Sequence, residues 1–362
     1  MLREIVEPLM EWYRENHRIL PWREQKNPYY IWISEIMLQQ TRVEAVKPYF
    51  DRFIKALPEV EDVAACPEEQ LLKLWEGLGY YNRVRNIQKA AVRIVEEYGG
   101  KLPADYGKLK ELPGIGSYTA GAVASIAYDI PVPAVDGNVL RVISRITENY
   151  DDILKQSVKT RVEKELSEII PPDRPGIFNQ ALMELGAMVC VPNGMAKCEK
   201  CPVAHLCKAK AHCTVTELPV KKKAKERRME KKTVLVIRDG DRVAIRRRPP
   251  RGLLAGLYEL PNLEGHLQEE QILEWTRDYS FTPLRIQRLA DSRHIFSHVE
   301  WDMIGYVVRV AALDEGCEKD LLFAETAKVE GQYPVPAAFH AYASYMNMKL
   351  GQEKHEAQEA EL

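Results

Sequence analysis

Two acidic residues stand where a carboxyl group can serve catalysis. Glu35 lies in an expected helix that begins after Asn27 and Pro28, on a mostly apolar face with Ile31, Trp32, Leu38 and Gln39. A carboxyl group on such a face resists ionisation, so the pKa of Glu35 should be raised. Asp136 directly precedes an apolar-periodic helix, and a helix N-terminus favours its charged form. We expect one proton donor and one negative charge, against the plainer alternatives of an exposed glutamate and a simple N-cap.

A second chemical feature is a cluster of four of the chain's seven cysteines: Cys190, Cys198, Cys201 and Cys207. Clustered thiolates bind either Zn²⁺ or a [4Fe–4S] cube, because both accept a tetrahedral set of sulfur ligands. Buried thiols without a metal are the third alternative, and the spacing alone does not decide. Cys213, His205 and His212 are the other candidate ligands nearby.

A third feature is the stretch LPGIGSYTAG, which places Gly114 and Gly116 at the start of an expected helix. Backbone amides at a helix N-terminus bind anions, and phosphate is the obvious candidate. A P-loop would need Gly-Lys-Ser/Thr after the second glycine, and a dinucleotide fold would need a strand before the first; neither is present. Two helices joined by a tight turn remain, with a turn that serves packing alone as the alternative.

Two halves of different pattern must position these residues. Residues 1–213 show helical spacing of apolar side chains, with breaks at proline or glycine. From Thr233 two strand-like runs meet at an Asp-Gly turn, further strands follow, and a helical period returns near the end, so the second half is expected to be α+β. Residues 214–232 are interpreted as a basic linker, and residues 351–362 as an acidic disordered tail.

Length and charge set wider bounds. A chain of 362 residues is expected to form two domains. The 51 lysines and arginines nearly cancel the 53 acidic residues, so the overall charge neither requires nor excludes a nucleic-acid partner. Neither a signal peptide nor an apolar run of bilayer length is evident, which favours a cytoplasmic protein.

The glycine hairpin followed by Asp136 resembles the signature of the helix–hairpin–helix glycosylase superfamily, over residues 1–213. The resemblance implies an all-α catalytic half, with a six-helix barrel over about residues 23–138 and an iron–sulfur subdomain formed by residues 1–22 and 139–213. The cysteine spacing is similar to the iron–sulfur loop of endonuclease III and MutY glycosylases, with one more residue in its first loop. It therefore favours a [4Fe–4S] cluster on the four clustered cysteines.

Tyr118 stands where the endonuclease III branch carries the lysine that attacks the sugar. A phenol cannot form an imine, so the resemblance is to MutY-type adenine DNA glycosylases, which hydrolyse the bond without cutting the strand. It implies that Glu35 protonates a flipped adenine at N7. Asp136, with Tyr118 and Asn138 beside it, would stabilise the oxocarbenium-like sugar or bond to it transiently.

The same resemblance implies several DNA contacts. Gly114 and Gly116 would hold a phosphate, and Gln180 would read adenine because an amide both donates and accepts. Other members of the motifs would form the pocket wall, fill the gap or wedge the base stack: Trp22, Arg23, Leu38, Gln40, Tyr80 and Tyr81. For the aromatic residues, core packing is the alternative.

In the second half, GLLAGLYELPN resembles the MutT-type Nudix fold, but no Arg-Glu-x-x-Glu-Glu helix follows. Residues 233–350 are therefore expected to be a recognition domain without pyrophosphohydrolase activity. Phe296, Ser297 and His298 are expected on a β-strand whose alternation turns Ser297 to the opposite face. The resemblance implies that they read 8-oxoguanine; incidental strand histidines and a zinc pair are the alternatives.

Together these features predict a glycosylase that removes adenine opposite 8-oxoguanine or guanine in double-stranded DNA. We expect a monomer without a membrane partner, in the cytoplasm at the nucleoid. An endonuclease III-like pyrimidine glycosylase with AP-lyase activity is disfavoured by Tyr118. A non-catalytic iron–sulfur DNA-binding module is disfavoured by the joint presence of Glu35 and Asp136.

Overall fold

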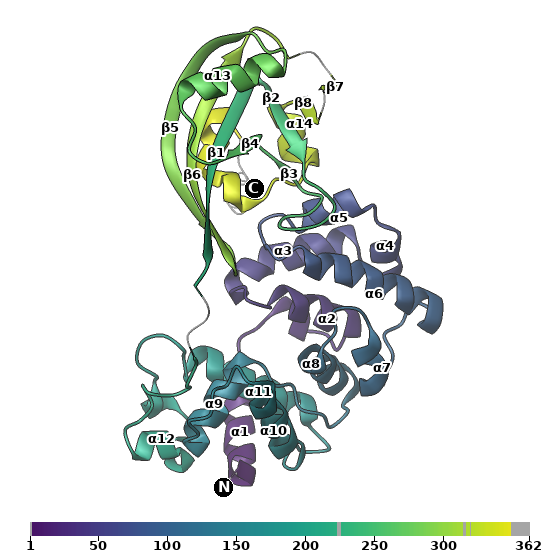
Figure 1. Cartoon of the computed structure of the whole chain (residues 1–362). Coiled ribbons are helices and arrows are strands. Elements are labelled where there is room, and N and C mark those ends of the chain that lie inside the picture. The colour runs from purple at the N-terminus through teal and green to yellow at the C-terminus, as the bar shows by residue number, and fades with distance from the viewer. Residues whose placement is uncertain (1, 223–225, 314–315, 319, 349–362) are drawn as a thin grey trace. The chain divides into compact units, whose positions relative to one another are not determined.

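The computed structural model describes residues 2–222, 226–313, 316–318 and 320–348, and it divides into two compact units (Figure 1). The first comprises Met1–Ala65 with Arg85–Ala224, and the second comprises Cys66–Val84 with Lys225–Leu362. Residues 66–84, which the sequence analysis assigned to the helical half, therefore group with the second unit. The acidic tail predicted for residues 351–362 lies outside the described residues.

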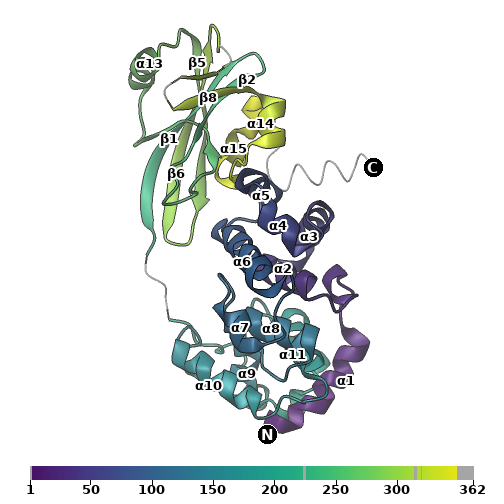
Figure 2. The same cartoon turned by 90° about the vertical axis from the view of Figure 1, so that its right-hand side faces the viewer.

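The first unit is helical, as predicted. Its α-helices are α1 (Val6–Asn16), α2 (Pro28–Met37), α3 (Val43–Ala56), α4 (Val60–Ala65), α6 (Asn82–Tyr98), α7 (Tyr106–Glu111), α8 (Ser117–Tyr128), α9 (Gly137–Thr147), α10 (Gln156–Ser167), α11 (Pro175–Met188) and α12 (Lys208–Ala211). Short 3-10 turns are η1 (Leu2–Ile5), η2 (Pro21–Arg23), η3 (Cys198–Lys200) and η4 (Ala204–Leu206). Helix α8 packs against α2 and α11, and α11 also packs against α1 and α9 (Figure 2).

Local chemistry explains where the helices of the site begin. Asn27 caps α2 by accepting the Tyr29 amide at 2.9 Å, and Pro28 occupies the first helical position, as predicted. Asp136 caps α9 by accepting the Val139 amide at 2.8 Å. These two caps fix the helices that carry the candidate carboxylates.

The expected helix–hairpin–helix is formed by α7 and α8. Gly114 has a φ of +76°, and a Cβ there would lie 2.7 Å from the Cβ of Asn86, so both the backbone and the packing require glycine. Gly116 is the N-cap residue of α8 and has a φ of −87°.

The second unit contains an eight-stranded sheet in the order β5-β6-β1-β2-β8-β7, with β3 beside β2 and β4 beside β1. The strands are β1 (Arg228–Asp239), β2 (Arg242–Arg247), β3 (Tyr258–Glu259), β4 (Asn262–Glu264), β5 (Pro283–Ile295), β6 (Val299–Val310), β7 (Gly316–Glu318) and β8 (Leu321–Glu325). Strands β1 and β6 are parallel, whereas the other pairs are antiparallel. The Asp-Gly turn predicted between β1 and β2 is present, with Asp239 opposite Arg242.

Both faces of this sheet are covered by helices (Figure 2). Helix α13 (Glu269–Asp278) covers one face, where Leu235, Ile237 and Ile304 belong to the apolar core. The other face meets α14 (Thr326–Gln332), α15 (His340–Ala343) and the turns η5 (Ala337–Phe339) and η6 (Ser344–Met346), around Trp301 and Tyr342. Helix α5 (Glu68–Leu74) and the first three residues of α6, 82–84, also belong to this unit.

Two sequence predictions need correction. Strand β1 begins at Arg228, so residues 228–232 of the predicted linker are part of the sheet. The segment from His294 to Trp301 is not one strand, because β5 ends at Ile295 and β6 begins at Val299. In the described part of the chain, no helix has the length and apolar character needed to cross a bilayer.

Candidate active site

The hydroxyl of Tyr118 donates a hydrogen bond to the carboxylate of Glu35, and this contact joins residues 83 positions apart. Glu35 lies on the buried helix α2 and is only 6% exposed. Tyr118 lies in the first turn of α8, and its hydroxyl is also 3.8 Å from the sulfur of Met183. The packing of α2 on α8 therefore brings together two of the predicted catalytic residues.

Burial governs the protonation of this pair. Burial raises the pKa of Glu35 and the charge of Asp136 adds to the rise, whereas the Tyr118 hydrogen bond and the Arg23 guanidinium lower it by less. Burial and then the neighbouring charges of Glu35 and Asp136 hold the pKa of Tyr118 well above its ordinary value. Glu35 can thus hold a proton at a pH where an exposed glutamate is ionised, and Tyr118 stays a hydrogen-bond donor.

Asp136 is held by a short chain of polar contacts. Its carboxylate accepts the Val139 amide and, at 2.7 Å, the side-chain amide of Asn138. The oxygen of Asn138 accepts from Arg141 at 2.9 Å, and Arg141 also donates to the carbonyls of Gly186 and Cys190, each at 2.8 Å. Asn138 is thereby fixed in the orientation that presents its amide to Asp136.

The expectation that the two carboxyl groups have pKa values displaced in opposite directions is wrong for the chain without DNA. Burial raises the pKa of Asp136 too, and the bonds from Val139 and Asn138 and the charge of Arg141 lower it by less. The helix N-terminus that was expected to dominate is thus outweighed by desolvation. What still separates the two groups is their donors, since Asp136 accepts from a backbone amide and from Asn138.

Two residues that support this site were missed in the sequence. Asn179 is fully buried on α11, accepts the Ala134 amide and donates to Ser125 and to the Val132 carbonyl, so it fixes the loop that leads to Asp136. Gly186 lets α11 approach α9 closely, because a Cβ there would lie 2.7 Å from the Cβ of Asn138. Asn179 and Gln180 are adjacent polar residues in an otherwise largely apolar helix, and this was the available signal.

Glu184 was also missed, although it anchors the predicted pocket wall. It is fully buried on α11 and pairs with Arg23 at 2.9 Å and with Arg18 at 2.5 Å. Burial alone would raise the pKa of Glu184, but the two guanidinium groups outweigh it and lower the pKa. A lone acid among the apolar residues of α11 was the same signal that singled out Glu35.

The other predicted pocket residues are placed as follows. Trp22 is 2% exposed and packs edge-on against Phe50, with ring centroids 5.3 Å apart. The amide of Gln180 is engaged at both ends, accepting from Tyr13 at 3.2 Å and donating to the Gly176 carbonyl at 3.1 Å. Any base contact by Gln180 would therefore replace or share these bonds.

The predicted DNA-contacting residues differ in exposure. Gln40, shortly after the C-cap residue Leu38, is exposed and has a left-handed backbone (φ +62°). Tyr80, in the second unit, is also left-handed (φ +48°) and is 49% exposed, whereas Tyr81 is 6% exposed. The Tyr81 ring, as it lies, is part of the core and is not a surface wedge.

The four clustered cysteines line one mostly apolar cavity, together with Val142, Ile146, Leu185, Val189 and Val203. Arg145 donates to the sulfur of Cys190 at 3.2 Å, and burial raises the pKa of Cys201 to about 12. Cys213 is exposed and does not line the cavity, and His212 pairs with Glu148 at 2.6 Å. No three His, Cys, Asp or Glu side chains in the described ranges already surround a single ion position. The four thiols instead face a shared space.

In the second unit, Phe296, Ser297 and His298 form the tight turn between β5 and β6. The amide of Phe296 donates to the Val299 carbonyl at 2.8 Å, so Ser297 and His298 are its two central, exposed residues. The Phe296 ring packs edge-on against Trp301 at 4.9 Å. A two-residue turn without glycine or asparagine gives no usual hairpin signal, which explains why the sequence suggested a continuous strand.

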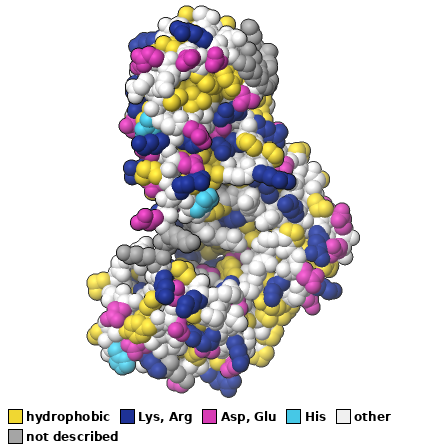
Figure 3. Space-filling model, in the orientation of Figure 1, with side chains coloured by type: hydrophobic (Ala, Val, Ile, Leu, Met, Phe, Trp, Pro, Cys, Tyr) yellow, Lys and Arg dark blue, Asp and Glu magenta, His cyan; other side chains and the backbone are white. Residues whose placement is uncertain are grey.

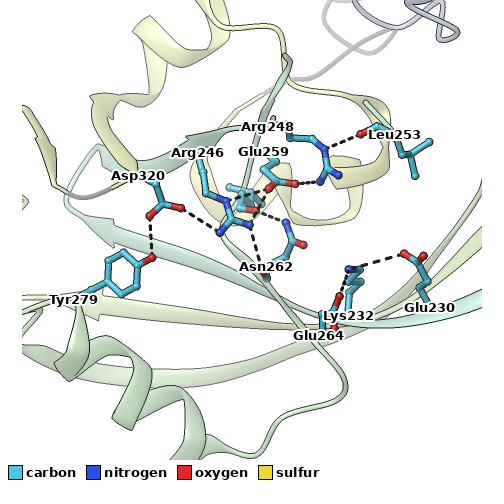
Figure 4. Close-up of polar contacts among 11 residues, drawn as sticks. Glu230, Lys232, Arg246, Arg248, Leu253, Glu259, Asn262, Glu264, Tyr279 and Asp320 are labelled. Carbon is cyan, nitrogen blue, oxygen red and sulfur yellow. Dashed lines mark hydrogen bonds and ion pairs between the residues drawn. The ribbon is translucent and has the colours of Figure 1, made fainter. Parts of the chain in front are cut away.

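The second unit also holds a buried acid, Glu259, at the centre of several polar contacts (Figure 4). Glu259 is 2% exposed and pairs with Arg248 and, at 2.9 Å, with Arg246. Arg248 donates to the Leu253 carbonyl at 2.9 Å and lies 5.6 Å over the ring of Trp301. Glu259 of the GLLAGLYELPN motif is therefore linked to the Phe296 ring through Arg248 and Trp301.

Comparison with known proteins agrees with this architecture. The family model described as "HhH-GPD superfamily base excision DNA repair protein" matches residues 33–172, and a NUDIX domain model matches residues 233–345. The chain is 35% identical to an adenine DNA glycosylase from Mus musculus over 85% of its length and 70% of the mouse protein. It is 33% identical to one from Buchnera aphidicola subsp. Schizaphis graminum, over 84% of this chain and 87% of that protein.

Solved structures resemble the helical half. A thermostable thymine-DNA glycosylase is 29% identical, with a TM-score of 0.52 over 58% of this chain and 97% of its own. A non-covalent endonuclease III–DNA complex is 29% identical as well, with a TM-score of 0.51 over 59% of this chain and 96% of its own. The fold class predicted from the sequence is thereby confirmed.

Proposed function

This chain belongs to the adenine DNA glycosylase family of base excision repair, and we propose that it hydrolyses the N-glycosidic bond of adenine paired with 8-oxoguanine or guanine in duplex DNA. The contact between Tyr118 and Glu35 carries this proposal. A phenol bonded to a buried acid can orient that acid, but it cannot attack a sugar to form an imine. An endonuclease III-like lyase is disfavoured on this ground.

Glu35 would act as the general acid. Adenine must leave the duplex stack before its glycosidic bond can be reached. Protonation at N7 makes adenine a better leaving group, and burial keeps the proton on Glu35 until then. Tyr118 holds the acid in one orientation and stabilises the carboxylate that forms once the proton has moved.

Asp136 would stabilise the positive sugar or bond to it transiently. The amide of Val139 and the side chain of Asn138 already donate to its carboxylate, so the negative form is prepared before the sugar cation appears. The positive sugar would attract the Asp136 carboxylate, and this attraction would offset the cost of burying its negative charge. Water then completes hydrolysis.

Backbone at the hairpin would hold the DNA. Gly116 has an ordinary φ, and nothing lies within 4 Å of the position of a Cβ. The open space beside Gly116 leaves the backbone amides at the start of α8 accessible to a ligand. A DNA phosphate could bind there.

The Phe296-Ser297-His298 turn would read the base opposite adenine. Ser297 and His298 are exposed, while the Phe296 ring packs against Trp301. The turn therefore presents two polar side chains and is anchored by an aromatic contact. 8-Oxoguanine differs from guanine by a carbonyl at C8 and a proton on N7, and Ser297 is the proposed partner for that difference. Replacing all three residues by alanine should erode the preference by roughly 1–3 kcal/mol, with base release from bound adenine retained. An undiminished preference in parallel kinetic measurements would contradict this role.

A [4Fe–4S] cluster would be held by Cys190, Cys198, Cys201 and Cys207, since all four face one cavity. Arg145 donates to the sulfur of Cys190, which would be a negatively charged thiolate when it binds the cluster. When bound, the cluster supplies metal–thiolate bonds that tie residues 198–207 to Cys190, which lies just after α11. The purified protein should be brown and contain more iron than zinc. A colourless, zinc-loaded and active protein would refute the assignment.

Single-turnover incubation with a duplex carrying adenine opposite 8-oxoguanine tests the reaction. Adenine should be released, and strand breaks should follow only after alkali treatment. Glu35→Gln and Asp136→Asn should each abolish release while duplex binding persists, because positioned acid–base groups contribute mainly to the transition state. Strand breaks without alkali, or release by either variant, would contradict the mechanism.

We propose that the chain acts as a monomer in the cytoplasm, at the nucleoid.

A further inference from the structure

Three arginines stand side by side on one face of the sheet, at the end of β5 and β6 remote from the Phe296 turn. Arg238 of β1 is paired in register with Arg309 of β6, and Arg309 is paired with Arg285 of β5. Strand alternation places all three on the face that carries Val236 and Val307. We call Arg238, Arg285 and Arg309 the arginine row.

The row is electrostatically unbalanced within the part of the chain that the structure describes. No carboxylate there pairs with any of its members. Arg238 donates only to carbonyls, at 2.7 Å to Tyr345 and at 2.7 Å to Gly240, while Arg285 and Arg309 are exposed. On the face drawn in Figure 3, by contrast, basic and acidic side chains are interspersed. Like charges on directly paired strand residues destabilise a sheet, so the row has a cost that packing does not explain.

The row also lines a cavity of about 410 Å³, a size within the range of ligand pockets, roughly 300–1,000 Å³. Its other lining residues are Gln287, Val307, Ser344 and Tyr345. Guanidinium groups bind carboxylates or phosphates through paired hydrogen bonds. Three adjacent cations are better matched by adjacent phosphates than by a single carboxylate, and Gln287 and Ser344 add neutral donors.

From this cavity we infer that the second unit has a phosphate-binding site formed by Arg238, Arg285 and Arg309. Its ligand carries at least two neighbouring phosphate groups. Such groups occur both in the backbone of DNA and in a free pyrophosphate or nucleotide, and the two sources are separated below. The inference does not depend on the proposed glycosylase reaction, because base release is not its readout.

The test uses the full chain with Arg285→Gln and Arg309→Gln combined. Arg238 is kept, since it ties β1 to the turn that contains Tyr345. The matched control combines Arg277→Gln and Lys328→Gln, which removes the same charge from exposed helical positions of the same unit. A third variant, which combines Arg285→Lys and Arg309→Lys, keeps the charge but loses the paired geometry and should retain part of the binding.

One arm measures thermal unfolding in sodium pyrophosphate against sodium chloride of equal ionic strength. The other measures binding to an undamaged duplex over a series of salt concentrations. A pyrophosphate-dependent rise in Tm that the double glutamine variant lacks would identify a free phosphate ligand. A salt slope lower by about 0.9 for each lost phosphate contact would identify the DNA backbone. Either change supports the site if the control variant keeps the pyrophosphate-dependent rise in Tm and the original salt slope.

Two outcomes would overturn the inference. One is that the double variant and its control behave alike in both arms. The other is a Tm of the double variant, without added phosphate, well below that of the control. That result would mean that the row stabilises the fold, whereas relief of repulsion between like charges predicts an unchanged or higher Tm.

Discussion

Gly186→Ala should slow base release by displacing Asn138, which positions Asp136. A Cβ at Gly186 would lie 2.7 Å from the Cβ of Asn138, where ordinary contacts begin at 3.4 Å. One of the two helices must therefore move by about 0.7 Å, the difference between these two distances. Because Asn138 donates to Asp136 at 2.7 Å, the displacement reaches the carboxylate directly.

The size of the effect follows from that displacement. Overpacking of this kind costs roughly 1–3 kcal/mol of unfolding free energy, offset by up to about 1 kcal/mol because alanine favours the helix. A misplacement of about 1 Å at catalytic groups can cost on the order of 100-fold in rate, so we expect a reduction of roughly 10- to 100-fold. Duplex binding should change little.

The assay is single-turnover adenine release with saturating enzyme, together with thermal unfolding. Gly331→Ala is the control, since nothing lies within 4 Å of a Cβ there and its Tm should not fall. Adding Asn138→Gly to Gly186→Ala removes the clash, but it also removes the bond to Asp136 and the bond from Arg141, so the rate should stay low. A wild-type rate and an unreduced Tm for Gly186→Ala would refute the reasoning.

Other predictions concern protons, sulfur and the buried acid of the second unit. Base release requires protonated Glu35, so its rate should fall as pH rises through the pKa of Glu35. Tyr118→Phe removes a hydrogen bond that lowers this pKa, so the falling limb of the pH–rate profile should move to higher pH. Cys198→Ser should reduce iron content and soluble yield, whereas Cys213→Ser should leave the visible absorption intact. Glu259→Gln, by loosening Arg248 over Trp301, should weaken the kinetic preference for 8-oxoguanine over guanine without abolishing adenine release.

The sequence predicted features that depend on local chemistry. Asn27 and Asp136 could be recognised as helix starts because a cap acts within a few residues of itself. The turn at Gly114 follows from the same kind of short-range rule. The contact between Tyr118 and Glu35 could not be derived in this way, because it exists only once α2 and α8 pack together. Tyr118 was singled out by resemblance, and its partner emerged from the fold.

Two errors have a common physical origin. The Phe296 turn was interpreted as a strand because its flanking residues alternate, and alternation does not report where a chain reverses. The pKa of Asp136 was expected to be low because its cap is visible in the sequence, whereas its burial is not. In both cases the sequence showed a short-range pattern. It did not show the pairing of β5 with β6 or the burial of Asp136.

The shift at Asp136 bears on how two buried carboxyl groups can serve opposite roles. Both are driven toward the neutral form by desolvation, so burial alone does not assign the acid. The donors assign it, because Asp136 accepts from a backbone amide and from an Asn138 side chain that Arg141 holds in place. Those bonds favour the negative charge on Asp136, which a positive sugar would stabilise further, whereas burial keeps Glu35 protonated until a base accepts its proton. The arrangement therefore lets the substrate select which carboxyl group ionises: the leaving base takes the proton of Glu35, and the sugar cation stabilises the charge of Asp136.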